Sequence, residues 1–137
     1  MHRLSCRALL LSIAILVMGA CSNTPIVTNP TPGTPVTDTF SGTLSKNGAF
    51  THAFSISTLG SITTTIVALA PNSAQIVGLQ LGVWNGTSCT AASSTDTATT
   101  GSSITLTASS AGIVCARLYD VGFVSDPVLY QLQVVHP

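Results

Sequence analysis

Few side chains of this 137-residue chain are suited to acid-base or nucleophilic catalysis. A serine hydrolase needs a base beside its nucleophile and a third group that orients the base. Serines are abundant, but beyond the N-terminal segment the only histidines are His52 and His136, and His136 is the penultimate residue. His52 alternates with Phe50 and Phe54, which predicts a partly buried packing role for its ring. We therefore expect a non-enzyme, with a small hydrolase around His52 as the less favoured alternative.

Two carboxylates in the C-terminal part, Asp120 and Asp126, are the candidates for a calcium site. Ca²⁺ takes oxygen ligands, so two loop carboxylates together with backbone carbonyls would suit it. Two solvated turn acids are the alternative interpretation, and we favour it. The sequence contains no His-rich metal motif and no phosphate-cradling loop, so we expect neither a metal nor a cofactor.

The four cysteines divide into two groups. Cys6 lies near the N-terminus, before the apolar run, and Cys21 directly follows Gly19 and Ala20. Cys89 and Cys115 remain as a pair, 26 residues apart, without the Cys-x-x-Cys spacing of a redox or metal site. In an exported protein this pair predicts a structural disulfide.

Trp84, Arg117 and Tyr119 are the candidates for ligand binding. If Val83 points into the core, strand alternation sends Trp84 outward, and it sends Arg117 and Tyr119 outward near Cys115. An exposed indole and phenol beside a guanidinium suit stacking on a sugar ring or a peptide side chain. The alternative, which we favour from sequence, is that Trp84 covers the disulfide and a sheet edge.

Residues 1–20 have the three parts of a secretory signal: a basic start, an apolar run over 8–17, and the small residues Gly19 and Ala20. The apolar run is shorter than the roughly 20 residues of a membrane-spanning helix. Met18-Gly19-Ala20-Cys21 resembles the bacterial lipobox, in which signal peptidase II cleaves before a lipid-modified cysteine. The resemblance implies that Cys21 carries a diacylglycerol and an N-acyl chain, and that the lipid anchors the protein to a membrane.

Residues 21–37 follow as a predicted linker, with four of the chain's seven prolines. Because proline fixes φ and lacks an N–H donor, a semi-extended tether is expected. After removal of residues 1–20, Lys46 and Arg117 stand against four aspartates, which gives 2 − 4 = −2. Two cations cannot neutralise a run of phosphates, so nucleic acid is not an expected partner.

Residues 38–137 are predicted to form one all-β domain, a small antiparallel sandwich of jelly-roll type. Short alternating segments predict strands over 39–44, 49–57, 61–69, 76–84, 102–108, 113–119 and 128–135. Asn47-Gly48 predicts a type I′ hairpin between the first two, Asn85-Gly86 repeats this turn signal, and Asp126-Pro127 predicts a turn before the last strand. The residues predicted to face the core are Phe50, Phe54 and Ile56; Leu79, Leu81 and Val83; Val114, Ala116 and Leu118; and Tyr130, Leu132 and Val134.

Four segments of this domain resemble the bacterial pre-peptidase C-terminal domain family. They are Phe-Ser-Gly-Thr-Leu at 40–44, Phe-Ser-Ile at 54–56 before Gly60, Val-Cys-Ala-Arg-Leu-Tyr at 114–119 after Gly112, and Tyr-Gln-Leu-Gln-Val at 130–134. The resemblance implies a β-sandwich and a non-catalytic accessory role, which in some relatives includes binding of calcium or an extracellular polymer. The chain departs from the family in lacking an attached peptidase and in having Asp38 without a second acidic residue beside it.

Together these features predict a cell-envelope lipoprotein, anchored in the outer membrane, whose β-sandwich is an accessory or adhesion module. Ser22 after Cys21 is compatible with outer-membrane sorting. The expected partners are the membrane, through the lipid, and an extracellular polymer or protein. A carbohydrate-binding module that uses Trp84, Arg117 and Tyr119 is the alternative.

Overall fold

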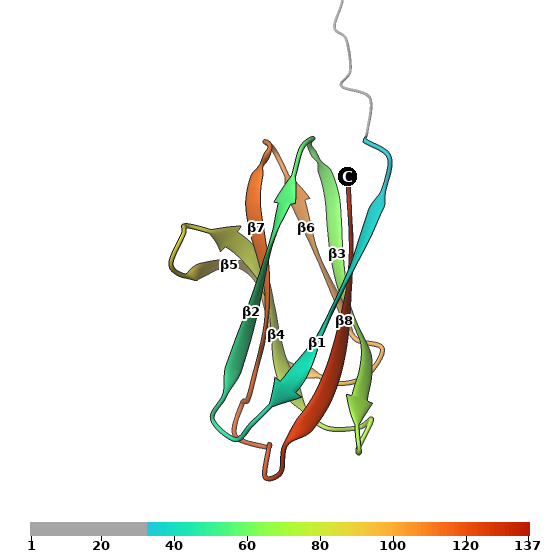
Figure 1. Cartoon of the computed structure of the whole chain (residues 1–137), viewed down its shortest axis with the longest axis vertical. Helices are drawn as coiled ribbons and strands as arrows, with labels where there is room; N and C mark the ends of the chain where they lie inside the picture. Colours follow the sequence, from blue (N-terminus) through green and yellow to red (C-terminus); the bar gives the residue numbers. More distant parts are fainter. Residues whose placement is uncertain (1–32) are drawn as a thin grey trace, which may run out of the picture.

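The computed structural model describes residues 33–137 of the chain. The predicted signal peptide, Cys21 and most of the predicted linker lie outside the described residues. Eight β-strands form the described part (Figure 1). They are β1 (Val36–Leu44), β2 (Ala49–Ile56), β3 (Gly60–Ala70), β4 (Val77–Trp84), β5 (Cys89–Ala98), β6 (Ser103–Ala108), β7 (Gly112–Tyr119) and β8 (Val128–His136).

The strands form two four-stranded antiparallel sheets that pack face to face. Sheet A has the strand order β1-β8-β3-β6, and sheet B has the order β2-β7-β4-β5. Each strand of the first half is therefore paired with its counterpart from the second half: β1 with β8, β2 with β7, β3 with β6 and β4 with β5. Nested pairing of this kind, in two packed sheets that have eight strands in total, is the jelly-roll arrangement. The predicted all-β sandwich is confirmed.

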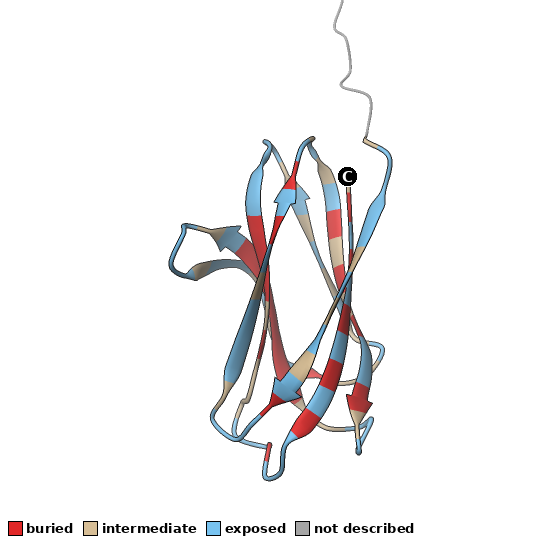
Figure 2. Ribbon diagram, viewed as in Figure 1, coloured by how far each residue is buried: buried red, intermediate tan, exposed pale blue. Residues whose placement is uncertain are grey.

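Apolar side chains fill the space between the two sheets. Along β8 every second residue from Val128 to His136 is buried and the residues between them are exposed, as the alternating bands of Figure 2 show. Burial of one large aliphatic side chain contributes roughly 1.5–3 kcal/mol, so this inner layer is the main source of stability. Its largest fully buried apolar side chains are Leu44, Ile62, Ile66, Leu79, Leu81, Leu118 and Leu132.

β5 is the strand that the sequence pattern does not predict. Its ten residues are Thr, Ser, Ala, one Asp and one Cys, and Ala98 alone among them is buried. β5 therefore lacks the alternation of apolar and polar residues by which a strand is recognised in a sequence. The other seven strands lie within three residues of their predicted ends.

The prediction of a hairpin at Asn47-Gly48 is wrong. β1 belongs to sheet A and β2 to sheet B, so the turn between them crosses from one sheet to the other. Asn47 has φ of 55°, and the Gly48 amide donates to the Ser45 carbonyl at 2.8 Å, which closes a four-residue turn. Only one central residue with positive φ is needed for such a turn, whereas a type I′ hairpin needs two.

Two of the residues predicted to face the core remain exposed. Phe50 is 44% exposed and Val83 is 56% exposed. Both lie one residue from the end of their strand, where the facing sheet no longer covers them. The Phe50 ring still packs toward the interior, with its centroid 6.0 Å from that of Tyr130.

Both ends of the described chain lie at the same end of the sandwich (Figure 1). Val36 at the start of β1 pairs with His136 at the end of β8. β1 thus begins two residues before the predicted domain boundary at residue 38. Within residues 33–137 there is no helix of the length and apolarity that crossing a membrane requires.

Candidate functional site

Strand β4 is covered on both of its faces, which explains why six consecutive residues, 77–82, are buried. Leu79 and Leu81 face the core, whereas Gly78, Gln80 and Gly82 face the outside of sheet B. β5 folds over this outer face: a Cβ atom at Gly82 would lie 1.9 Å from the backbone carbonyl oxygen of Thr90. The register between β4 and β5 shifts at two places, and irregularities of this kind, such as β-bulges, bend a strand.

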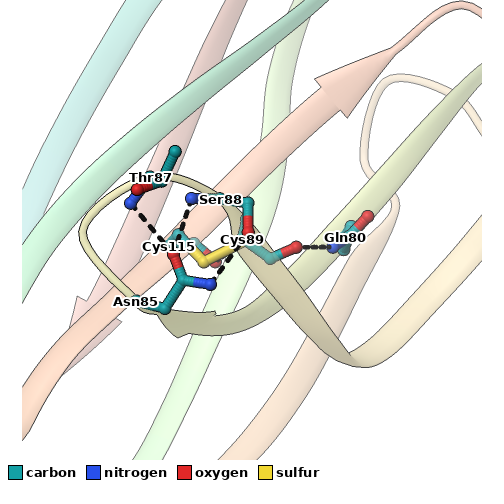
Figure 3. The surroundings of a disulfide bond; sticks show 6 residues. All are labelled: Gln80, Asn85, Thr87, Ser88, Cys89 and Cys115. Carbon is teal, nitrogen blue, oxygen red and sulfur yellow. Dashed lines mark hydrogen bonds between the residues drawn. A yellow bond between two sulfur atoms is a disulfide. The ribbon is translucent and has the colours of Figure 1, made fainter.

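The predicted disulfide between Cys89 and Cys115 is present and joins β5 to β7 across β4 (Figure 3). The two Cα atoms are 5.8 Å apart, and Cys115 pairs with Gly82 in the β7–β4 ladder. Gln80 donates from its side-chain amide to the Cys89 carbonyl at 3.0 Å. The bond therefore fastens the start of β5 to the outer face of sheet B.

The loop between β4 and β5 is closed by the side chain of Asn85. Its Oδ1 accepts hydrogen bonds from the backbone amides of Thr87 at 2.9 Å and Ser88 at 2.8 Å, and its Nδ2 donates to the Ser88 hydroxyl at 3.0 Å (Figure 3). Gly86 has φ of 97°, a conformation that glycine adopts at no steric cost. The Asn85-Gly86 signal thus belongs to a true hairpin, with a four-residue loop held in one shape.

A hollow of about 330 Å³ lies between this hairpin and the outer face of sheet B. We call it the Trp84–Arg117 hollow. Trp84 and Cys89 border it from the hairpin strands, and Arg117 and Thr51 border it from β7 and β2, where they are directly paired. Thr87 and Ser88 of the loop complete the wall. Its lining joins an indole and a guanidinium to three hydroxyl groups.

The structure brings Trp84 and Arg117 together but leaves Tyr119 outside the hollow. Tyr119 lies over Gly78, where a Cβ atom would meet its ring, and its hydroxyl donates to the Asp96 carboxylate on β5. Burial and the hydrogen bond to Asp96 raise the pKa of Tyr119 to about 12. The Arg117 guanidinium carbon lies 5.2 Å from the centre of its ring. Tyr119 is thus a second link between β7 and β5 across β4.

A second hollow, of about 260 Å³, opens at the end of the sandwich where the described chain begins and ends. Its floor is apolar: Ile56, Leu106 and Val114 come from facing strands of the two sheets. Trp84 borders this hollow as well as the first one, and it is partly exposed. Trp84 is therefore partly open to solvent and not fully buried beneath the hairpin.

His52 packs among aromatic rings, as its position between Phe50 and Phe54 predicts. Its ring stacks on Phe40 at 4.7 Å, and its Nε2 shares a hydrogen bond of 2.8 Å with the Tyr130 hydroxyl. Burial lowers the pKa of His52 below the usual histidine value, which favours the neutral ring. Within the described residues, the hydrogen-bond partner of His52 is thus a tyrosine and not a carboxylate.

His136 has a structural role that the sequence analysis misses. Its ring is 5% exposed and lies 5.2 Å from the ring of Phe54, and its Nε2 is 3.1 Å from Oδ2 of Asp38. The contact joins the last residues of β8 to β1. Since 98 residues separate the two partners, no local pattern could have indicated it.

Asp120 is a turn acid whose carboxylate organises the loops at the opposite end of the sandwich. Its Oδ1 accepts the backbone amides of Gly122, Phe123 and Val124, and its Oδ2 accepts that of Asn47 at 2.8 Å. Burial opposes ionisation, but the four N–H donors lower the pKa of Asp120 below the usual value. The charge thus holds the β7–β8 loop against the β1–β2 turn.

Asp126 accepts a hydrogen bond from the Ser125 hydroxyl at 3.1 Å. Within residues 33–137, no three His, Cys, Asp or Glu side chains lie close enough together to hold a metal ion. No protein-family model matches the chain, and a search of curated proteins finds no match. The resemblance to the pre-peptidase C-terminal domain family therefore stays a prediction.

Proposed function

We propose that the protein is a non-catalytic accessory module of the adhesion type, a lipoprotein of the bacterial cell envelope that binds an extracellular polymer through the Trp84–Arg117 hollow. The observation that carries this proposal is the hollow itself. An aromatic face next to a guanidinium and several hydroxyl groups is a set of groups that suits polar ring-shaped ligands such as sugars.

The support beneath the hollow strengthens the proposal. Binding costs less conformational entropy when the side chains of the site are already held in place, so the affinity is higher. Here the hairpin that carries Trp84 is fixed by the disulfide, by the Asn85 hydrogen bonds and by the Tyr119 contact with Asp96. This bracing suits a preformed site on a rigid scaffold.

Retention on insoluble cell-envelope polysaccharide tests the binding function. We expect the wild-type protein to sediment with the polysaccharide and to be released by soluble fragments of the same polymer. A protein that stays in the supernatant with every envelope fraction, and that binds no soluble oligosaccharide, would contradict the proposal.

The lipid anchor is tested by the substitution Cys21→Ser. The modifying transferase needs the thiol as its nucleophile, and signal peptidase II acts on the lipid-modified form. We therefore expect the variant to incorporate no labelled fatty acid and to accumulate as the uncleaved precursor, whereas Cys6→Ser, the matched control, is labelled and processed normally. Normal processing of Cys21→Ser would reject the lipoprotein assignment.

A further inference from the structure

Arg117 is a charged side chain without a charged partner among the described residues. Within residues 33–137 no carboxylate lies within ion-pair distance of the Arg117 guanidinium, and no hydrogen bond from it to another described residue is found. The one close contact of a basic side chain with a carboxylate joins the His136 ring to Asp38. Arg117 nevertheless lies in the middle of sheet B, on β7, between Thr51 of β2 and Gln80 of β4. A cation held at the wall of a hollow without a counterion is available to an anionic ligand.

The position of Arg117 is supported from one side. Its guanidinium lies 5.2 Å from the centre of the Tyr119 ring, a distance at which a cation is attracted to an aromatic face. The ring is itself fixed by its hydrogen bond to Asp96. No described residue accepts a hydrogen bond from the guanidinium, and Arg117 and Trp84 border the same hollow.

The neighbours of Arg117 in the hollow suit a sugar ring. Trp84 offers an apolar face, and the exposed residues Thr51, Thr87 and Ser88 offer hydroxyl groups. The volume of about 330 Å³ lies at the lower end of the range for small-ligand pockets. A neutral sugar would use the indole and the hydroxyl groups but would leave the guanidinium unpaired.

We infer that the Trp84–Arg117 hollow binds an acidic saccharide, with a sugar carboxylate on Arg117 and the sugar ring against Trp84. This inference rests on the proposed binding function and names its ligand class. The planar fork of a guanidinium matches a carboxylate with two parallel hydrogen bonds. A phosphate monoester is less suitable, because Arg117 is the one cation in the lining of the hollow and would offset only part of its charge of about −1.5 to −2.

A comparison of matched oligosaccharides tests the inference. The probes are an oligogalacturonate and the neutral oligosaccharide obtained by reducing its carboxyl groups, with binding to the intact protein measured by calorimetry at low and moderate salt. We expect the acidic form to bind about tenfold more tightly, with a preference that falls as salt increases. The substitution Arg117→Gln is expected to remove that preference, so that the variant binds the acidic and the neutral form with equal affinity.

The controls separate a loss of charge from a loss of structure. Lys46→Gln removes the other described cation, which does not border the hollow, and should leave both affinities unchanged. Arg117→Lys keeps the positive charge but lacks the planar guanidinium, so it should retain part of the preference for the acidic oligosaccharide. All variants are compared at equal fractions of folded protein.

Equal affinity for the two forms, or an Arg117→Gln variant that keeps the acidic preference, would overturn the inference and leave the proposed binding function standing. Failure of the wild type to bind either form would also overturn the inference. The proposed binding function would then be tested separately, by retention of the protein on envelope polysaccharide.

Discussion

Substitution of Gly82 by alanine is expected to destabilise the domain by about 3 kcal/mol, the upper end of the cost of overpacking. The new Cβ atom would lie 1.9 Å from the carbonyl oxygen of Thr90 and 2.7 Å from its carbonyl carbon. Both are backbone atoms of β5, and the disulfide at Cys89 keeps that strand from moving away. Urea unfolding followed by tryptophan fluorescence measures the loss.

Gly112→Ala is the matched control for Gly82→Ala. Gly112 also lies in a strand of sheet B, but a Cβ atom there would meet no heavy atom within 4 Å. We expect its free energy of unfolding to change by no more than about 0.5 kcal/mol. If the two variants unfold at the same urea concentration, β5 does not lie over Gly82 as described.

Removal of the disulfide by Cys89→Ser together with Cys115→Ser is expected to lower the free energy of unfolding by about 3.5 kcal/mol. The estimate follows from the chain entropy that a bond across 26 residues removes from the unfolded state. The far-ultraviolet circular dichroism should stay that of the wild type, because the strand pairings of the sandwich do not depend on the bond. Reduction of the wild-type protein should give the same loss of stability.

Thiol titration of the native protein tests whether the disulfide is formed. The two sulfur atoms are bonded in the native protein, so an exported wild-type protein should show no free thiol at positions 89 and 115. Two titratable thiols at those positions in the native state would contradict the account, as would a double variant as stable as the oxidised wild type.

The inner layer of the sandwich could be predicted because its signal is local. Val128, Tyr130, Leu132 and Val134 alternate with polar or exposed residues, and burial of one face of β8 follows directly from that period. β5 could not be predicted, because its small and polar residues show no alternation of apolar side chains. The β1–β2 turn was predicted wrongly because an Asn-Gly pair fits both a hairpin and a turn between sheets.

The candidate site was predictable only in part. Alternation along β7 places Arg117 on the outer face, and the predicted disulfide between Cys89 and Cys115 is confirmed. Thr51 and the loop hydroxyl groups could not be assigned, because their proximity depends on how β5 folds back over β4. Tyr119 could not be separated from the hollow, because its hydrogen-bond partner Asp96 lies on β5, a strand that the sequence does not reveal.

The most direct test of the account is a paired measurement on Trp84→Ala, in which polymer binding and urea unfolding are compared with those of the wild type. Unfolding is followed by circular dichroism in both proteins, because Trp84 is the single tryptophan of the chain. If Trp84 is a wall of the binding hollow, binding should weaken at least tenfold while the free energy of unfolding changes by less than about 1 kcal/mol. Unchanged binding together with a loss of about 3–5 kcal/mol in stability, as expected of a large buried aromatic side chain, would contradict the account.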